Sequence, residues 1–415
     1  MIATPAQSER IQSATDSISL EVSAAIESEH VQLGGIADGL SGFALLFEYR
    51  AECIGNAGDL ETAAGIATRA FRTMDRTALQ GFHRGLPGIA WTLRAIFGEA
   101  DGEAGGLESA FDSAASEVLE RLSNTPAMEA GLGNGLAGIG MFAIDAAPPG
   151  RRDEIASVVL DQLRDSATRD NDGARWITAP ERMPAWHRAR SEGYVDLTVA
   201  SGLPGVCYFL ARAIEADVCA AEAGELLEAC WRWLFSTPAA EAYRFDDFVP
   251  PLHGSDRSAR QVAWCRGDLG VSVTTLAAAT AAGDQAVAAS ALVIARDAIA
   301  GEAMSTAGRD ACLCHGWAGL LQLCNRLYQA TGEDLFRERA CDCLEQTLRL
   351  CEVEGGLRFI YPLAPSAPTP SLRSSIDLLA GASGVALALH AAASDVEPIW
   401  DRPLAIDVEP SKGQT

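Results

Sequence analysis

The segment from Cys314 to Gly319 (CHGWAG) opens a strongly apolar stretch, and its Gly-x-x-Gly spacing recurs along the whole chain. Seven copies are present, and each stands at the head of an apolar run. Their first glycines are Gly39, Gly85, Gly135, Gly202, Gly267, Gly316 and Gly381. Successive first glycines are 46, 50, 67, 65, 49 and 65 residues apart, which leaves room for two helices per interval. Such a period is typical of helical repeat proteins.

Two kinds of segment alternate within these intervals. Residues that follow the glycines, such as 43–47 (FALLF) and 206–210 (VCYFL), are apolar all round, so we expect helices that are buried on every side. Between them lie amphipathic stretches with one charged face, such as 152–167 and 333–353. The alternation predicts an all-α chain, an α/α toroid of seven helix-pair repeats with an inner ring and an outer jacket.

Each glycine of the motif has an expected purpose. We expect the first to permit a backbone turn that a side chain would forbid. The second, three residues on, is expected to let a neighbouring helix approach closely. Because repeats share one continuous core, we predict a single domain over residues 1–390, with rim loops at about 146–190 and 236–262 and a C-terminal tail over 391–415.

Composition restricts the function classes. The chain has 415 residues, is 48% hydrophobic and has a formal net charge of −24. So acidic a surface would be repelled by nucleic acid and by anionic membranes, whereas a neutral or cationic peptide is compatible with it. We find no signal peptide and no segment that would span a membrane. With eleven cysteines and no secretory signal, we expect a cytoplasmic protein with mostly free thiols.

Two of the seven repeats carry potential metal ligands. Cys265 stands two residues before the first glycine of repeat five, and Cys314 and His315 stand two and one before that of repeat six. Equivalent positions of adjacent repeats are neighbours in space, so we expect these three side chains to bind one Zn²⁺. Zinc prefers four ligands, so the fourth position would stay open for water or a substrate thiol. Cys312 is the nearest competing ligand, and we interpret it as a packing or supporting residue.

The charge of this ligand set indicates its chemistry. Two thiolates and a neutral imidazole bring Zn²⁺ close to electroneutrality, so a third, incoming thiol would be deprotonated on binding and yet remain nucleophilic. Three neutral histidines would leave a more Lewis-acidic zinc that is better suited to activating water. The sequence therefore favours thiol alkylation over hydrolysis.

At these residues the chain resembles the lanthionine synthetase C-like family, the cyclases of lanthipeptide biosynthesis. The resemblance runs from about Leu33 to about His390 and is carried by the repeats, by Trp-Cys-x-Gly and by Cys-His-Gly. It implies a double-layered α/α toroid with zinc on Cys265, Cys314 and His315. It also implies addition of peptide cysteine thiols to dehydroalanine or dehydrobutyrine, with a dehydrated precursor peptide as substrate and a dehydratase and a transporter as partners.

The chain departs from the family pattern at three positions. Family cyclases usually carry Ala-His-Gly in repeat four, with the histidine as acid or base, and this chain has Ser201 there. An aspartate often stands where Gly131 lies. An arginine is usual at Gln261, and Arg260 is one step away. The metal-binding half of the machinery is intact and the proton-transfer half is replaced.

Several residues are candidates for the missing proton donor. His83 lies two residues before the first glycine of repeat two, so repeat geometry places it at the same rim as the zinc ligands, as a substitute acid or as a histidine that hydrogen-bonds its own turn. Tyr194 and Asp196 are further candidates, with Asp196 also readable as a turn residue. His187 and His253 fall in the predicted rim loops. Protonation by water is the remaining alternative.

Three functions follow from these observations. The first is a zinc-dependent lanthipeptide cyclase with atypical acid chemistry. The second is a catalytically degenerate scaffold that binds zinc and the modified peptide for partner enzymes. The third is a zinc-dependent protein prenyltransferase subunit, which fits less well because that group uses an Asp–Cys–His ligand set and lacks the glycine repeats.

Overall fold

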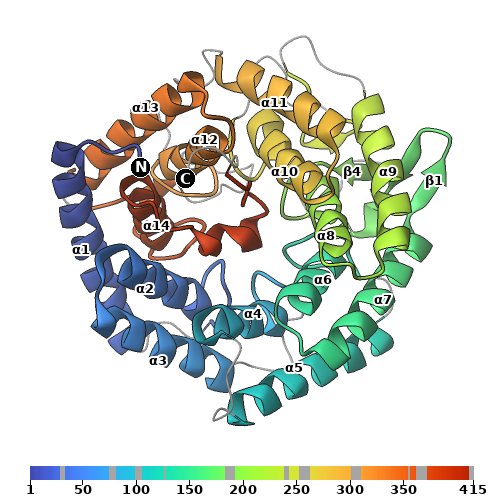
Figure 1. Cartoon of the computed structure of the whole chain (residues 1–415), viewed down its shortest axis with the longest axis horizontal. Helices are drawn as coiled ribbons and strands as arrows, with labels where there is room; N and C mark the ends of the chain where they lie inside the picture. The colour runs from blue at the N-terminus through green and yellow to red at the C-terminus, as the bar shows by residue number, and fades with distance from the viewer. Residues whose placement is uncertain are drawn as a thin grey trace. The chain divides into compact units, whose positions relative to one another are not determined.

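The computed structural model describes residues 1–28, 33–73, 81–98, 105–125, 128–182, 192–237, 243–251, 262–300, 310–353, 356–360 and 372–410 (Figure 1). The chain divides into two compact units. The first comprises residues 1–108, 305–361 and 371–415, and the second comprises 109–304 and 362–370. Both units are built mainly from helices.

The inner helices each begin at a Gly-x-x-Gly motif and are buried over most of their length. The first unit holds α2 (Leu40–Ile54), α4 (Leu86–Phe97), α12 (Trp317–Thr331) and α14 (Ala382–Ala393). The second holds α6 (Leu136–Asp145), α8 (Leu203–Glu215) and α10 (Gly267–Ala281). Most of their residues are apolar on several faces of the helix, which explains why they lie inside.

Outer, half-exposed helices cover the inner ones. In the first unit α3 (Ala57–Thr73) packs on α2, and α13 (Asp334–Cys351) packs on α12. In the second, α7 (Pro149–Ser166), α9 (Ala220–Ser236) and α11 (Gln285–Ala300) pack on α6, α8 and α10. Helix α5 (Gly105–Asn124) lies mostly in the second unit. The predicted alternation of buried and half-exposed helices is confirmed within each unit.

Helix α1 (Pro5–Glu27) is the outer partner of the last repeat. It packs against α14, and Figure 1 shows the two in dark blue and dark red. A local signal marks its start. Thr4 and Gln7 form a capping box, and Pro5 occupies the first turn, where its missing N–H has no cost.

The first glycine of most motifs is required by space rather than by a left-handed backbone. Gly39, Gly135 and Gly202 have negative φ, yet a Cβ at each would lie 2.3 Å from the carbonyl oxygen six residues earlier. That carbonyl is held there by the N–H that follows the glycine, as in Leu136 to Glu129 at 2.8 Å. Gly267 differs, because its φ of +74° is itself a conformation that favours glycine.

The second glycine has a different partner from the one predicted. A Cβ at Gly88 or Gly319 would lie 1.7 or 1.9 Å from the carbonyl of its own turn, six residues earlier. At Gly384, the second glycine of repeat seven, a Cβ would also lie 2.9 Å from the Cβ of Leu313, which belongs to the turn of repeat six. The prediction of a closely approaching helix was wrong, because these atoms belong to turns.

We expect Gly88→Ala to destabilise the protein by about 1–3 kcal/mol, because its methyl group would overlap the Phe82 carbonyl and force the turn apart. Gly65→Ala is the matched control. It lies exposed in α3 with nothing within 4 Å of the new Cβ, and should stabilise the protein by up to about 1 kcal/mol. Urea denaturation of both variants measures the difference, and equal effects would contradict this steric account.

Backbone hydrogen bonds join the turns of successive repeats. In the first unit the N–H of Cys314 donates to Leu379 O, that of Leu379 to Ala37 O, and that of Ala37 to His83 O, at 2.9–3.2 Å. In the second, Gly133 N–H donates to Ala200 O at 2.6 Å, and Val199 N–H donates to Cys265 O at 3.0 Å. In four of these five bonds, both residues stand two positions before the first glycine of their own repeat. The exception is Val199, which stands three positions before Gly202. Equivalent positions are therefore side by side within each unit.

Part of the first predicted rim loop is regular structure. Residues 149–166 form α7, and β1 (Thr168–Asp170) then pairs antiparallel with β2 (Gly173–Arg175). A second sheet has the order β3 (Ile177–Thr178), β4 (Tyr194–Asp196) and β5 (Phe248–Val249), and η1 (Pro180–Arg182) is a short 3₁₀ helix. In the first unit β6 (Phe359–Ile360) pairs with β7 (Leu372–Arg373). Strands of two or three residues are too short to show the alternation of apolar and polar residues by which a strand is predicted from sequence.

The predicted C-terminal tail is part of the first unit as far as residue 408. Helix α14 ends at Ala393, and the 3₁₀ helix η4 (Ile399–Leu404) follows with Trp400 and Asp401 fully buried. Asp401 accepts from the buried Arg326 guanidinium at 2.7 and 2.8 Å. The polar composition of this segment suggested a solvent-exposed tail, but its Asp401 is buried and paired with Arg326.

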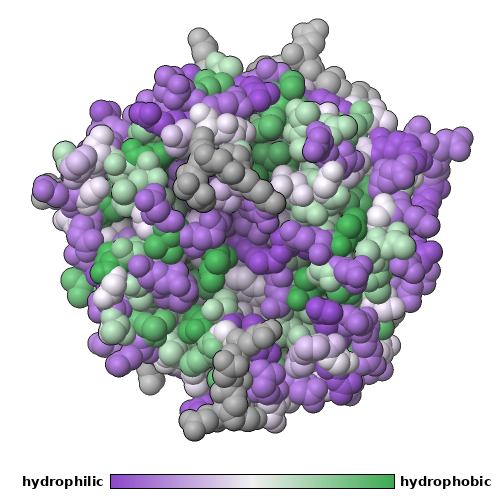
Figure 2. All heavy atoms as spheres, in the orientation of Figure 1, coloured by the Kyte–Doolittle hydropathy of each residue, from purple (hydrophilic) through white to green (hydrophobic). Residues whose placement is uncertain are grey.

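The viewed face of the molecule mixes polar and apolar side chains, with polar ones prevailing (Figure 2). Across the described residues, no helix combines the length and the low charge that crossing a bilayer requires.

Glu48, on the inner helix α2, makes stability depend on pH. It is 5% exposed, and burial together with nearby Glu52 raises the pKa of its carboxyl from 4.5 to about 7. The unfolded chain releases this proton near pH 4.5, so the stabilisation is complete below that value and is lost as pH rises through 7. We expect Glu48→Gln to be more stable than the wild type by up to about 3 kcal/mol at pH 8 and equally stable at pH 4.5. Thermal melts at both pH values measure this, and a pH-independent difference would contradict it.

Candidate metal centre

The repeat-six turn holds Cys314 and His315 directly before the N-cap of α12. Gly316 is that N-cap, and its N–H donates to the carbonyl of Cys312 at 3.0 Å. The N–H of Cys314 donates to the carbonyl of Leu379 in the repeat-seven turn at 2.9 Å. The Cys314 and His315 side chains are half-buried. The backbone beneath these two predicted ligands is thus fixed, while their side chains remain accessible.

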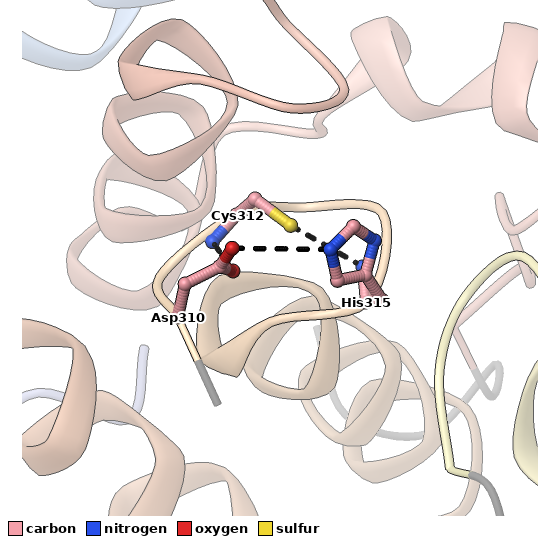
Figure 3. Close-up of side chains that lie close together, drawn as sticks. All are labelled: Asp310, Cys312 and His315. Atoms are coloured by element: carbon pink, nitrogen blue, oxygen red, sulfur yellow. Dashed lines mark hydrogen bonds and ion pairs between the residues drawn. The ribbon is translucent and has the colours of Figure 1, made fainter. Parts of the chain in front are cut away.

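Figure 3 shows Asp310 and Cys312 on the same side of the His315 imidazole, within one turn. The potential ligand atoms of the three residues lie within 4.8 Å of one another. Asp310 Oδ1 accepts the N–H of Cys312 at 2.9 Å, and Asp310 Oδ2 lies 3.8 Å from His315 Nε2. Cys312 Sγ accepts the N–H of His315 at 3.5 Å. Burial, aided by the Asp310 carboxylate, raises the pKa of the Cys312 thiol, as fits a packing residue.

Asp310 is a site residue that the sequence did not single out. A signal for it exists in repeat four, where Asp196 also stands six residues before the first glycine. Asp196 Oδ1 accepts the N–H of Thr198, two residues on, at 2.7 Å, just as Asp310 caps Cys312. An aspartate at this position closes the turn through a side-chain-to-backbone hydrogen bond.

Cys265 lies in the repeat-five turn of the second unit. Its side chain is half-buried, and its carbonyl accepts the N–H of Val199 from repeat four at 3.0 Å. The next residue, Arg266, pairs with Asp247 at 3.2 Å and is the N-cap of α10. Cys265 is therefore held as firmly as Cys314. Because it belongs to the other unit, its convergence with Cys314 and His315 stays a prediction.

The two positions where family cyclases carry a histidine and an aspartate are neighbours in the second unit. A Cβ at Gly131 would lie 2.5 Å from Ser201 O and 2.7 Å from Ser201 Cα. The backbones of the two turns therefore touch at this point. Ser201 itself is exposed. An aspartate at Gly131 would have no room, whereas a larger side chain at Ser201 would meet solvent.

The other candidates for proton transfer have structural partners. His83 is 5% exposed, its Nε2 lies 2.9 Å from Pro403 O, and burial lowers the pKa of its imidazole. This contact favours the hydrogen-bonding role over that of a substitute acid. Tyr194 is buried against Phe248, with ring centroids 4.7 Å apart. Asp196 is a turn residue, and burial raises the pKa of its carboxyl to about 6. His187, His253, Arg260 and Gln261 lie outside the described residues.

The fold and the turns together define a helix-pair repeat protein that carries thiol and imidazole side chains before two of its inner helices. The family model for lanthionine synthetase C-like proteins matches residues 32–404, so the chain belongs to that family.

Among solved structures, the chain is similar to nisin cyclase, with a TM-score of 0.74 and 17% identity over 95% of this chain and 97% of that one. The predicted fold class, an α/α toroid, is confirmed by this match. The Lin0763 protein from Listeria innocua matches with a TM-score of 0.45 and 13% identity, over 85% of this chain and 84% of that one. No curated protein sequence matches the chain.

Proposed function

We propose that this protein is a zinc-dependent lanthipeptide cyclase that adds cysteine thiols of a dehydrated precursor peptide to dehydroalanine or dehydrobutyrine. The observation that carries the proposal is the placement of Cys265, Cys314 and His315 at matching positions of two repeat turns. Each is half-buried on a backbone fixed by hydrogen bonds to an adjacent turn or to its own. The two thiolates and the imidazole fit Zn²⁺ and leave one position for a substrate.

The proposed reaction needs residues that hold the zinc and a source of the proton for the α-carbon. When bound, Zn²⁺ supplies deprotonation of the incoming thiol at neutral pH while its sulfur stays nucleophilic. Cys314 and His315 are half-buried and so remain partly accessible, whereas Cys312 is fully buried. The new S–C bond forms at the β-carbon of the dehydro residue, and a proton must reach the α-carbon. Neither Ser201 nor Gly131 offers an imidazole or a carboxyl group to deliver this proton, so we assign its delivery to the solvent.

The alternative is a scaffold that binds the modified peptide for partner enzymes without closing rings. The residues at positions 131 and 201 favour it, because Gly131 and Ser201 carry neither a carboxylate nor an imidazole. Both functions share the metal and the peptide, so only the reaction separates them.

A thiol-trapping assay separates the two functions. The purified chain is incubated with a peptide that carries one cysteine and one dehydroalanine, and remaining thiols are alkylated and counted by mass spectrometry. A cyclase removes the trappable thiol without changing the peptide mass, loses this activity with a chelator and regains it with zinc. Unchanged trapping while the peptide stays bound would identify the scaffold and contradict the proposal.

Ser201→His should accelerate ring closure, by about 10²-fold if the histidine takes the position of a general acid. The side chain is exposed, so the imidazole fits without disturbing the turn. Ser201→Asn is the control, since it adds bulk and polarity but cannot donate a proton efficiently. Initial rates from the same trapping assay measure the effect. Equal rates for the two variants would mean that proton delivery does not limit the reaction, contrary to this prediction.

A further inference from the structure

The carboxylate of Asp310 lies beside the imidazole of His315, and the surrounding backbone holds it in place. Asp310 is 4% exposed. Its Oδ1 accepts the N–H of Cys312 at 2.9 Å, and its main-chain carbonyl accepts the N–H of Trp317 at 2.9 Å. Gly316 closes the remaining side, because a Cβ there would be 2.6 Å from Asp310 Oδ1. The second oxygen, Oδ2, is thereby aimed at His315, at 3.8 Å from Nε2 (Figure 3).

The 3.8 Å between Asp310 Oδ2 and His315 Nε2 is an ion-pair distance, longer than a hydrogen bond. A carboxylate in this position selects one imidazole tautomer. With the proton on Nε2, toward Asp310, the lone pair is on Nδ1, which is the atom through which this tautomer would bind a metal. Carboxylates that stand behind metal-binding histidines orient the ring and raise its basicity in this way.

We propose that Asp310 is a positioning residue that fixes the tautomer and orientation of His315 for zinc binding. The inference rests on the proposed function, because it presupposes that His315 is a zinc ligand. Asp310 acts through His315 and does not touch the substrate.

Asp310, Cys312 and His315 are also close enough to hold a metal by themselves. Such a metal would be closed to a substrate thiol, since Asp310 and Cys312 are buried at 4% and 0% exposure. An open centre needs the accessible Cys314 instead. Asp310 therefore fits a supporting role behind His315 better than membership of a separate catalytic site.

Repeat four supplies a matched control within the same chain. Asp196 holds the position of Asp310 and makes the same cap to the backbone, at 2.7 Å to Thr198. The residue in the place of His315 is Ser201, so the turn of repeat four supplies no histidine of its own to Asp196. An asparagine at either position keeps an oxygen that accepts the capping N–H and removes the negative charge. Both substitutions keep the cap to the backbone and remove a negative charge, but only Asp310→Asn removes it from beside His315.

The test is zinc affinity, measured on the full chain by competition with a chromophoric chelator. Thermal melts of the same samples confirm folding. We expect Asp310→Asn to weaken zinc binding by about 10–100-fold. Asp196→Asn and Cys312→Ala should bind zinc as the wild type does.

Wild-type affinity in Asp310→Asn would overturn the positioning role while leaving the zinc centre in place. Loss of zinc in Asp310→Asn and Cys312→Ala, with Cys265→Ser unaffected, would place the metal in the buried group and overturn both this inference and the proposed centre. A wild-type chain that binds no zinc would overturn the proposed function, and the inference with it.

Discussion

Cys265→Ser is expected to remove tightly bound zinc and to slow ring closure by more than about 100-fold, beyond the 10–100-fold that loss of an outer partner costs. A serine hydroxyl stays protonated at neutral pH and is a poor zinc ligand, so the centre would lose one of its two negative charges. Zinc content by elemental analysis and the rate of thiol loss in the trapping assay measure the two effects.

Cys341→Ser is the control for this substitution. Cys341 is also half-buried but lies on the outer helix α13, away from the turns. It should keep both zinc and activity. If Cys265→Ser also kept both, Cys265 would not be a ligand and the proposed centre would be wrong.

The second large effect concerns stability. Asp401→Ala should destabilise the protein by about 3–5 kcal/mol, because it leaves the guanidinium of Arg326 buried without its main counter-charge. Arg326 and Asp401 are both 0% exposed, and Gln322 donates to the same carboxylate at 2.6 Å. The substitution also frees the segment whose Pro403 carbonyl holds His83.

Asp395→Ala is the matched control, because that carboxylate is 78% exposed and pairs only with the chain's amino terminus among the contacts described. Exposed pairs of this kind contribute little, and its effect should stay within about 0.5 kcal/mol. Urea denaturation of both variants decides the matter. A loss of under about 1 kcal/mol for Asp401→Ala would show that the pair does not anchor the C-terminal segment.

The inner helices and their starts could be predicted because each repeat carries its own physical requirement. Gly88 and Gly319 leave no room for a methyl group, and a largely apolar helix after each motif has to be buried. These constraints act within some ten residues, so the sequence displays them directly. The partner of the second glycine was misjudged, because a pattern shows that space is needed without showing which atom needs it.

What escaped prediction depends on pairing between distant segments. Strand β5 owes its existence to β4, more than 50 residues earlier, and is too short to show a period of its own. Asp401 reads as a polar tail residue until Arg326, 75 residues away, is found beside it. Asp310 is near His315 in sequence, but the sequence does not show that the fold of the turn brings Asp310 Oδ2 to 3.8 Å from the His315 ring.

The proposed zinc centre is tested most directly by measuring the metal content and the metal ligands of the purified chain. Elemental analysis combined with zinc K-edge X-ray absorption should find one zinc per chain, bound by two sulfur atoms and one imidazole nitrogen, with a lighter atom or added thiol in the fourth position. A chain without stoichiometric zinc, or a zinc whose shell contains a carboxylate and a single sulfur, would contradict the account.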